Sequence, residues 1–315
     1  MFGTRIPYYD PRLTKQVKRA DVNDKFYQSL FEPPKFLLIH RIYQFFCFFI
    51  FLGPIKLLFS FVLFIIWFVL IRIIPLFEGF FKNQKSYKNF SQKILRNIAR
   101  AFLFASGIIK ININGSINPD ARFIVSNHIS LLDFFIYFAV LPITIIKKAE
   151  IPGWESLLTG TVIDMFYIKS RDQYITPAEQ LEYVASDPSY HPILHFPEDR
   201  PTNGNSILSF KTPAFGTDYY VQISSISYFM GFTFQGFNTV ASTDDFNVYL
   251  FLRLLAMPFI TCQIDFLQPR ISKTELPDQI SASKKAEDAQ LQIANGLGVL
   301  AISRGVSQSG SSPRK

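Results

Sequence analysis

The chain contains 315 residues, of which 49% are hydrophobic and 35 are phenylalanine, and its formal net charge is +8. Its mean hydropathy of +0.18 is high for a water-soluble protein and predicts a surface that contacts a membrane. A positive charge fits nucleic acid or anionic lipid, but no nucleic-acid-binding module is present and basic residues flank an apolar block, so lipid is the favoured partner.

Residues 1–35 form a charged N-terminal arm, for which we expect loose order and at most one short helix. The arm is polar and contains four prolines, so no cleavable signal peptide is expected. The two cysteines of the chain, Cys47 and Cys262, make neither a disulfide framework nor a metal-binding pattern. This cysteine usage favours a reducing, cytosol-facing location.

Residues 36–77 form the predicted membrane element. Two apolar runs, 42–52 and 57–71, flank Gly53-Pro54, and each is shorter than the roughly 20 residues that a spanning helix needs. One arrangement is a hairpin that enters and leaves by the same face; in the other, one or both runs span the bilayer. Basic residues on both sides favour two cytoplasmic flanks and therefore the hairpin. The remaining alternative is a helix pair in the core of a soluble protein.

Residues 82–107 have the pattern of a basic amphipathic helix. Its apolar face carries Phe90, Ile94, Leu95, Ile98, Phe102 and Phe104. The opposite face carries Lys88, Lys93, Arg96 and Arg100. Such a helix can lie on a lipid surface. An ordinary helix that packs against the rest of the fold explains the pattern equally well.

From residue 108 to about 267, short strands and helices alternate, which predicts an α/β fold with a mixed sheet layered with helices. The expected strands are 108–113, 123–125, 144–147, 165–168, 193–196 and 219–228. The expected helices start at Ser130, span 154–160 and span 177–185 with Thr176 as the cap, and 211–216 is a turn or short helix.

A polar helix is expected at 284–294, close to the end of the chain. We take residues 82–303 as one folded domain. Residues 304–315 are rich in serine and glycine and are expected to form a disordered tail.

The most informative stretch joins the strand 123–125 to the helix that starts at Ser130. In α/β proteins, ligands bind at the carboxyl ends of strands, and His128 lies in that position. Asp133, in the first helical turn, can fold back onto His128, and such a pair makes a general base whose carboxylate fixes the imidazole tautomer. The structural alternative is that Ser130-x-x-Asp133 is a capping box with Asp in place of Glu.

Two later segments place charged side chains at strand ends. The strand 165–168 is followed by Arg171, whose planar guanidinium can hold a phosphate through two hydrogen bonds. The strand 193–196 runs into a turn with Glu198 and Arg200, which supply a hydrogen-bond acceptor and a phosphate donor together. Read alone, the first segment is equally a solvated strand end, and the second is equally a plain loop.

Four blocks in this order resemble the PlsC-like family of glycerolipid acyltransferases: Asn127-His128-x4-Asp133, the segment of Arg171, Phe196-Pro197-Glu198, and Phe210-Lys211-x2-Ala214-Phe215. The similarity covers roughly residues 90–265. The first and third blocks are specific as an ordered pair, whereas either alone is weak. Thr202-Asn203-Gly204 is most similar to the lysophospholipid acyltransferase branch with a membrane hairpin, in which fungal lysophosphatidic acid:oleoyl-CoA acyltransferases have a comparable length.

The resemblance implies a PlsC-like acyltransferase fold and direct acyl transfer from acyl-CoA, without a metal or another cofactor. His128 would take the proton from the free hydroxyl of a lysophospholipid, and Asp133 would orient His128 and stabilise its charge. The implied substrate-binding residues are Asn127, Arg171, Glu198 and Arg200. Among these, Glu198 would order the acceptor site, and the arginines would hold the acceptor phosphate.

Two departures from the family pattern bear on substrate choice and activity. After the glutamate the family usually has Gly-Thr, often followed by arginine, whereas here Asp199, Arg200 and Pro201 follow. Arg200 is therefore displaced by one position. The block around Val221–Tyr228 lacks the proline expected near Ile223.

These features together predict an acyl-CoA-dependent acyltransferase that acts on lysophosphatidic acid or a related lysophospholipid. We expect it on the endoplasmic reticulum membrane or on lipid droplets, with its catalytic domain in the cytosol. One alternative is a non-catalytic membrane scaffold that keeps the fold, which intact His128 and Asp133 disfavour. The other is a CoA-independent transacylase that exchanges chains between phospholipids.

Overall fold

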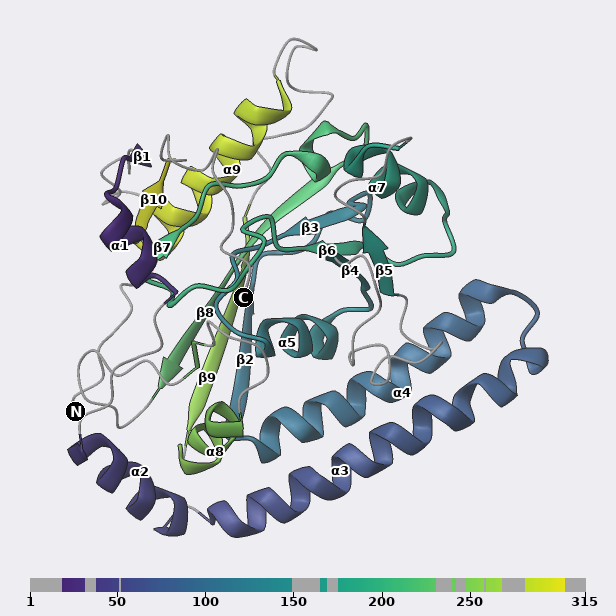
Figure 1. Ribbon diagram of the computed structural model, residues 1–315. Coiled ribbons are helices and arrows are strands. Elements are labelled where there is room, and N and C mark those ends of the chain that lie inside the picture. Colours follow the sequence, from purple (N-terminus) through teal and green to yellow (C-terminus); the bar gives the residue numbers. More distant parts are fainter. Residues whose placement is uncertain are drawn as a thin grey trace.

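The structure is a computed structural model, and it describes residues 19–31, 38–50, 52–148, 165–168, 175–230, 240–241, 248–257, 259–267 and 281–303 (Figure 1). The expected helix at 154–160, Arg171 and the predicted tail 304–315 lie outside these described residues.

A mixed sheet forms the centre of the fold, as the alternation of strands and helices predicts. Its strands are β2 (Ile108–Asn114), β3 (Phe123–Val125), β4 (Thr144–Lys148), β5 (Met165–Ile168), β6 (Ile193–His195), β8 (Val221–Met230) and β9 (Ile260–Phe266). Their spatial order is β2-β9-β8-β3-β6-β4-β5. Neighbouring strands are parallel except β8 and β9, which pair antiparallel. The short strand β3 lies in the middle and is buried along its whole length.

Helices cover both faces of the sheet, and each face has its own apolar core (Figure 1). One face carries α4 (Gln84–Ala105), α5 (Leu132–Val140) and α8 (Val248–Ala256). The other face carries α7 (Pro177–Ser186), the 3-10 turn η2 (Pro213–Gly216) and α9 (Ala282–Leu297). The predicted start of α7 is confirmed: Thr176 caps it in a complete capping box with Glu179, and Pro177 occupies the first turn.

A second, three-stranded parallel sheet ties the N-terminal segment to the end of the chain. It has the order β1 (Arg19–Ala20), β10 (Leu300–Ile302), β7 (Ser206–Ile207), and the short helix α1 (Asp24–Ser29) follows β1. Leu30 is 1% exposed and packs with Leu208 and Ile302. Residues 19–31 of the predicted loose arm are therefore held against the folded body, because this apolar cluster and the strand pairing fix them.

Two helices make up the apolar segment: α2 (Leu38–Ile50) and α3 (Gly53–Ile73), which continues into the 3-10 helix η1 (Ile74–Phe80). The expectation that both apolar runs are too short to span is wrong for the second run. Gly53-Pro54 begins α3 instead of interrupting it, because proline is tolerated in a first helical turn. The chain breaks one residue earlier, at Leu52, which has a left-handed backbone with φ 60°.

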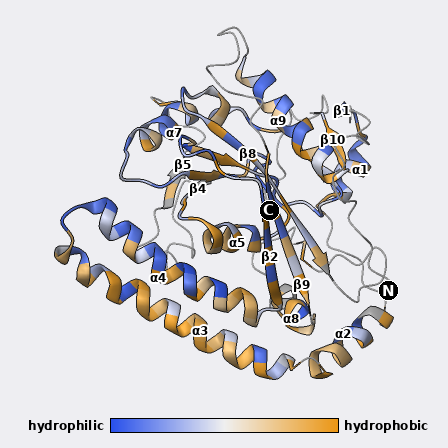
Figure 2. Ribbon diagram, turned by 180° about the vertical axis from the view of Figure 1, so that it is seen from behind, coloured by the Kyte–Doolittle hydropathy of each residue, from blue (hydrophilic) through white to orange (hydrophobic). Residues whose placement is uncertain are grey.

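The described residues contain one helical stretch long and apolar enough to cross a membrane, Gly53–Phe80, whereas the apolar stretch Arg41–Ile50 is shorter. In Figures 1 and 2, α2 and α3 meet end to end at an open angle and do not run side by side. The structure therefore does not show the predicted hairpin of two matched membrane segments.

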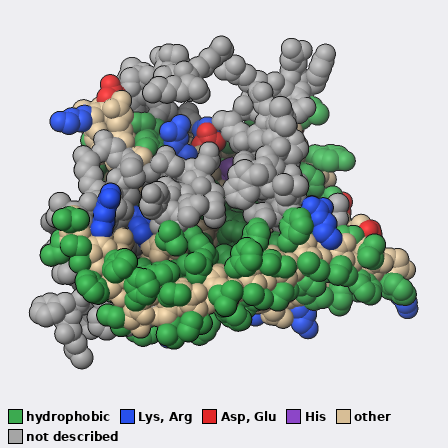
Figure 3. All heavy atoms as spheres, turned by 60° about the horizontal axis from the view of Figure 1, so that its bottom comes forward, with side chains coloured by type: hydrophobic (Ala, Val, Ile, Leu, Met, Phe, Trp, Pro, Cys, Tyr) green, Lys and Arg blue, Asp and Glu red, His purple; other side chains and the backbone are tan. Residues whose placement is uncertain are grey.

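One stripe of α3 packs inward and the rest of its apolar surface is exposed. The buried residues Ser60, Leu63, Trp67 and Ile71 recur every three or four positions, which places them on one side of the helix. The Trp67 ring packs edge-on against Phe138 of α5 at 5.9 Å between ring centroids. Figure 2 shows α3 as mostly hydrophobic, and in Figure 3 hydrophobic side chains form a continuous band with Lys and Arg at its borders.

Helix α4 packs against α3 and α5 and uses its polar face to hold α5. Arg96 donates to the carbonyl oxygen of Val140 at 2.6 Å, and Arg100 donates to that of Ala139 at 2.8 Å. These two carbonyls belong to the last turn of α5, where no helical N–H can reach them. The packing interpretation of this amphipathic helix therefore accounts for two of the basic residues on its polar face.

His191 is a buried histidine that makes the fold sensitive to acid. Its Nε2 lies 2.8 Å from Oδ1 of Asn89 on α4. Burial, followed by the positive charges of Lys88, Lys85, Arg96 and Arg122, lowers the pKa of His191 to about 4. Because this pKa is below the unfolded value of 6.5, the unfolded chain binds more protons between these pH values, and stability falls as pH drops through that window.

We expect His191→Gln to be less stable than the wild type at pH 7, because the exchange disturbs a buried contact, and the gap to shrink at pH 4.5. The neutral glutamine does not share the acid penalty, which is on the order of 1–2 kcal/mol. Urea unfolding of both proteins at the two pH values measures the gap. A stability gap of the same size at pH 7 and pH 4.5 would contradict the lowered pKa of His191.

Candidate active site

Two neighbouring parallel strands deliver polar residues to the same edge of the sheet. Val125 at the end of β3 is in register with His195 at the end of β6. The residues that follow, Ser126 to His128 on one side and Phe196 to Glu198 on the other, therefore meet at the carboxyl edge. This edge is the usual ligand-binding edge of α/β sheets, and the sequence analysis predicted both segments at the ends of strands.

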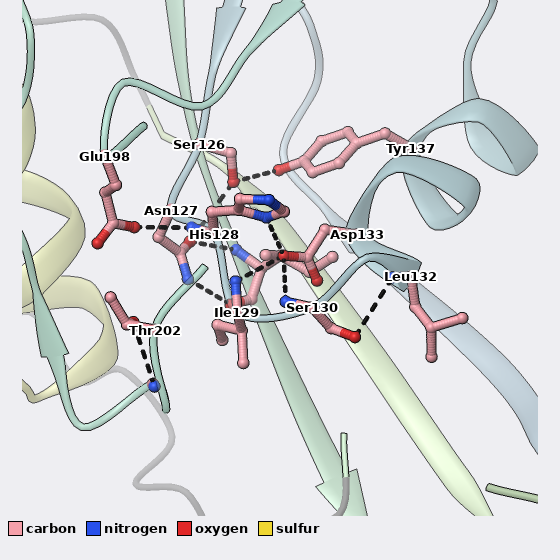
Figure 4. A network of polar contacts seen from close by, with 12 residues as sticks. Ser126, Asn127, His128, Ile129, Ser130, Leu132, Asp133, Tyr137, Glu198 and Thr202 are labelled. Atoms are coloured by element: carbon pink, nitrogen blue, oxygen red, sulfur yellow. Dashed lines mark hydrogen bonds and ion pairs between the residues drawn. The ribbon is translucent and has the colours of Figure 1, made fainter. Parts of the chain in front are cut away.

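His128 and Asp133 are in direct contact (Figure 4). Nδ1 of His128 lies 2.9 Å from Oδ2 of Asp133, and the Asp133 side chain is fully buried whereas that of His128 is 15% exposed. A carboxylate accepts hydrogen bonds only, so Nδ1 carries the proton and Nε2 is the basic nitrogen. No described residue forms a hydrogen bond with Nε2.

The same carboxylate also organises the turn before α5. Oδ2 of Asp133 accepts from the backbone N–H groups of Ile129 at 2.6 Å and Ser130 at 2.9 Å. The Ser130 hydroxyl accepts from the N–H of Leu132, where α5 begins. The predicted capping box is not formed, because the N–H of Asp133 donates to the backbone carbonyl oxygen of Ser130 and not to its hydroxyl. One carboxylate oxygen of Asp133 nevertheless holds both the turn and the imidazole.

Glu198 holds two segments of backbone around the pair. Oε1 accepts from the N–H of His128 at 2.7 Å, and Oε2 accepts from the N–H of Leu208 at 2.9 Å. Burial raises the pKa of Glu198 to about 8, and the two N–H donors act in the opposite direction. The side chain thus connects the backbone of the predicted base to β7 and its neighbours.

The residue after Glu198 explains the first departure from the family pattern. Asp199 has φ 74°, in the left-handed region where glycine is favoured and where aspartate is one of the better-tolerated alternatives. Its carboxylate forms an ion pair with Lys211. The turn therefore keeps a backbone that suits glycine although glycine is replaced. Further along, the N–H of Thr202 donates to the carbonyl oxygen of His128 at 3.0 Å.

Asn127 is fully buried, and both ends of its amide bond to one residue of β8. Its Nδ2 donates to the carbonyl oxygen of Ile226 at 3.0 Å, and its Oδ1 accepts from the N–H of Ile226 at 2.9 Å. The side chain imitates a strand backbone and extends the β3–β8 pairing beyond Val125. The amide predicted to bind substrate is thus occupied by the fold in this structure.

Of the two predicted phosphate ligands, Arg200 lies within the described residues. The guanidinium of Arg200 lies 4.7 Å from the ring centroid of Phe31, in a cation–π contact with the N-terminal segment. Arg171 lies outside the described residues.

The sequence analysis gave no role to two residues that contact the predicted base pair, Phe196 and Tyr228. The ring of Phe196 stacks on that of His128, with centroids 4.3 Å apart and planes at 14°. The hydroxyl of Tyr228 donates to Oδ1 of Asp133. The hydroxyl of Tyr137 lies 2.8 Å from Oγ of Ser126 and 2.8 Å from Oγ of Ser224. Within the described residues, no group of three or more His, Cys, Asp or Glu side chains is placed to hold a metal ion.

Comparison with solved structures gives a match to the 1-acyl-sn-glycerophosphate (LPA) acyltransferase PlsC from Thermotoga maritima. The two share 15% sequence identity over 77% of this chain and 95% of that chain, with a TM-score of 0.53. The chain has the PlsC-like fold. No protein-family model and no curated protein gives a significant match to the sequence. The likeness therefore rests on the arrangement of helices and strands, not on overall sequence similarity.

Replacing Glu198 with glutamine tests its bridging contacts. One of the two backbone N–H groups would face an NH₂ group, and we expect the free energy of unfolding to fall by about 1–3 kcal/mol. Urea unfolding at pH 7 measures the loss. Glu182→Gln on α7 is the matched control, because no hydrogen bond or ion pair is described for Glu182, and it should change stability by less than about 0.5 kcal/mol. Equal stabilities for the two variants would contradict the bridge.

Proposed function

We propose that this protein is an acyl-CoA-dependent lysophospholipid acyltransferase with lysophosphatidic acid as its acceptor. The contact between His128 and Asp133 at the carboxyl edge of a PlsC-like sheet is the observation that carries the proposal. The sequence motif supports it from an independent direction, because its order and spacing predict this contact.

In the proposed reaction, Nε2 of His128 takes the proton of the acceptor hydroxyl while the oxygen attacks the thioester carbonyl carbon of acyl-CoA. Asp133 stabilises the imidazolium that forms. The C–S bond then breaks, and the leaving thiolate takes the proton back from the imidazolium. The products are the new ester and free CoA. Glu198 and Asp133 fix the backbone and the ring of the base, which orients it before substrate arrives.

The acceptor phosphate is assigned to Arg171, in the second block of the motif, and to Arg200, which lies one position away from the arginine of the family pattern. To bind the phosphate, the guanidinium of Arg200 must either leave the Phe31 ring or contact the ring and the phosphate at the same time. Asn127 and Glu198 support the acceptor site indirectly, since their polar atoms are engaged with backbone groups. The closer likeness to fungal lysophosphatidic acid:oleoyl-CoA acyltransferases stays a prediction from 202–204 and chain length.

The exposed surface of α3 is proposed to contact lipid. Large exposed apolar side chains cover α3 outside its buried stripe, and Figure 3 shows a continuous hydrophobic band on this face of the molecule. Exposed apolar surface of this extent marks an interaction site. The endoplasmic reticulum membrane or the lipid-droplet surface, with the catalytic domain in the cytosol, is the proposed location on the grounds of the basic flanks and unpaired cysteines.

His128→Ala should lower acyl transfer by about 10³-fold, because a general base contributes about 10²–10⁴-fold. The assay follows phosphatidic acid formation from lysophosphatidic acid and oleoyl-CoA, together with release of free CoA thiol. His191→Gln assayed at pH 7.5 is the control, since His191 lies outside the site and has its own partner, Asn89. Full activity in His128→Ala would remove the mechanism.

Three incubations of the wild type separate the proposal from its alternatives. Transfer only when acyl-CoA is present supports the acyltransferase. Transfer from diacyl phospholipid to lysolipid without acyl-CoA identifies a transacylase. Binding to vesicles without transfer under either condition identifies a scaffold.

Replacing Leu58, Phe61 and Ile65 together with serine tests the apolar face of α3. These residues are 66%, 60% and 46% exposed and lie on one side of the helix, so the change should spare the core. We expect binding to phosphatidylcholine–phosphatidic acid vesicles to fall at least about tenfold, since each side chain loses about 1.5–3 kcal/mol of apolar burial. Vesicle flotation measures this fall.

The matched control is Tyr183→Ser, which removes a 79%-exposed aromatic side chain from α7. It should leave flotation unchanged because α7 lies on the other side of the sheet from α3 (Figure 1). Undiminished flotation of the triple variant would assign membrane contact to another surface.

A further inference from the structure

The two oxygens of Asp133 have different partners. Oδ2 contacts His128 and the backbone N–H groups of Ile129 and Ser130, all within the turn that precedes α5. Oδ1 accepts a hydrogen bond from the hydroxyl of Tyr228, which lies 95 residues further along the chain. Among the described residues, Tyr228 is the partner of Oδ1. The second end of the carboxylate is therefore held from outside the motif.

The fold brings Tyr228 to this position through Asn127. The amide of Asn127 clamps the backbone of Ile226 on both sides and so fixes β8 beside the turn. Side chains two residues apart point to the same face of a strand, so Tyr228 follows Ile226 toward the face where Asp133 lies. Ile226 and Tyr228 belong to the apolar core on that side of the sheet, and Tyr228 is 8% exposed.

Tyr228 is suited to remain a donor. Burial and the nearby charge of Asp133 raise the pKa of Tyr228 well above its usual value of 10, so its hydroxyl keeps its proton at every pH of interest. A hydroxyl that donates to a buried carboxylate stabilises its charge and fixes its rotation. Both effects reach His128 through Oδ2.

We infer that Tyr228 is a positioning residue for the His128–Asp133 base. Its hydroxyl fixes the orientation of the Asp133 carboxylate and lowers the affinity of His128 for a proton. This inference deepens the proposed acyl transfer and rests on it for its catalytic meaning. Without the Tyr228 hydroxyl, more negative charge stays on the carboxylate beside the imidazole. His128 then holds its proton to a higher pH, and the pair is less well oriented.

Three other titratable groups lie near the carboxylate. They are Tyr137 on α5, Glu198 after β6, and Cys262 on β9, which is in register with Tyr228. Tyr137 provides a matched comparison, since its buried hydroxyl contacts Ser126 and Ser224 and makes no hydrogen bond with Asp133. Tyr137→Phe and Tyr228→Phe each remove one buried hydroxyl and keep the ring.

The test is a pair of measurements on the full chain as wild type, Tyr228→Phe and Tyr137→Phe. The first is the rate at which diethyl pyrocarbonate modifies His128 between pH 5 and 8.5, followed by peptide mass spectrometry, because only the neutral imidazole reacts. The second is the pH dependence of kcat and KM for acyl transfer. Melting temperatures identify any general loss of folding.

For Tyr228→Phe we expect the midpoint of His128 modification to rise by about 0.5–1 pH unit, since a hydrogen bond to a charged group and one unit of titration have similar free energies. The acid limb of kcat/KM should move with it. We expect kcat at pH 7 to fall about tenfold with KM changed by less than about twofold, because orientation of the base affects the chemical step.

Tyr137→Phe should keep the wild-type midpoint and pH profile, even if its melting temperature falls as much. An unchanged or lower midpoint in Tyr228→Phe, or the same rise in both variants, overturns the inference. Failure of the proposed function is distinguishable: the wild type would then transfer no acyl chain, while the modification midpoints would still report on Tyr228.

Discussion

A single buried carboxylate organises the site. Asp133 is fully buried yet accepts four hydrogen bonds: two from backbone N–H groups, one from His128 and one from Tyr228. A charge removed from water in this way is tolerated only when such donors replace the lost hydration. The turn before α5, the orientation of the imidazole and the contact with Tyr228 on β8 all meet that requirement.

The contacts of the buried carboxylate also explain why its structural role and its proposed chemical role cannot be separated. A capping residue alone would need only the backbone contacts, and a catalytic orienting residue alone would need only the histidine. Here one oxygen atom does both. Removing the side chain would therefore loosen the helix start and release the imidazole in the same step. Loss of activity after such a change says little about chemistry unless folding is measured alongside it.

The part of the site that is close in sequence could be predicted, and the part joined by the sheet could not. His128 and Asp133 are five positions apart across one turn, so local geometry brings them together. The strand ends before Asn127 and before Glu198 followed from hydrophobic patterning. Tyr228 could not be found in this way, because its contact depends on β8 lying next to β3, and strand order is not written in local periodicity.

In the apolar segment, the sequence analysis misread the role of a proline. Gly53-Pro54 was taken as an interruption because proline breaks a helix interior, but proline also suits a first turn, and here it starts a 21-residue helix. Hydropathy alone cannot tell whether a proline lies inside a helix or in its first turn, unless the chain break before the proline is known. The left-handed backbone of Leu52 provides that break, and nothing about leucine announces it.

The order of elements along the chain has a practical consequence for anyone who wishes to prepare a detergent-free form. Residues 19–31 precede the apolar helices α2 and α3. Within them, β1 pairs with β10, and the carbonyl oxygens of Leu30 and Ser29 accept hydrogen bonds from Asn203. Trimming from the amino terminus past α3 would discard these contacts together with the exposed apolar surface of α3. A soluble version would instead require internal excision, with a linker that rejoins the segment ending near Phe31 to the start of α4.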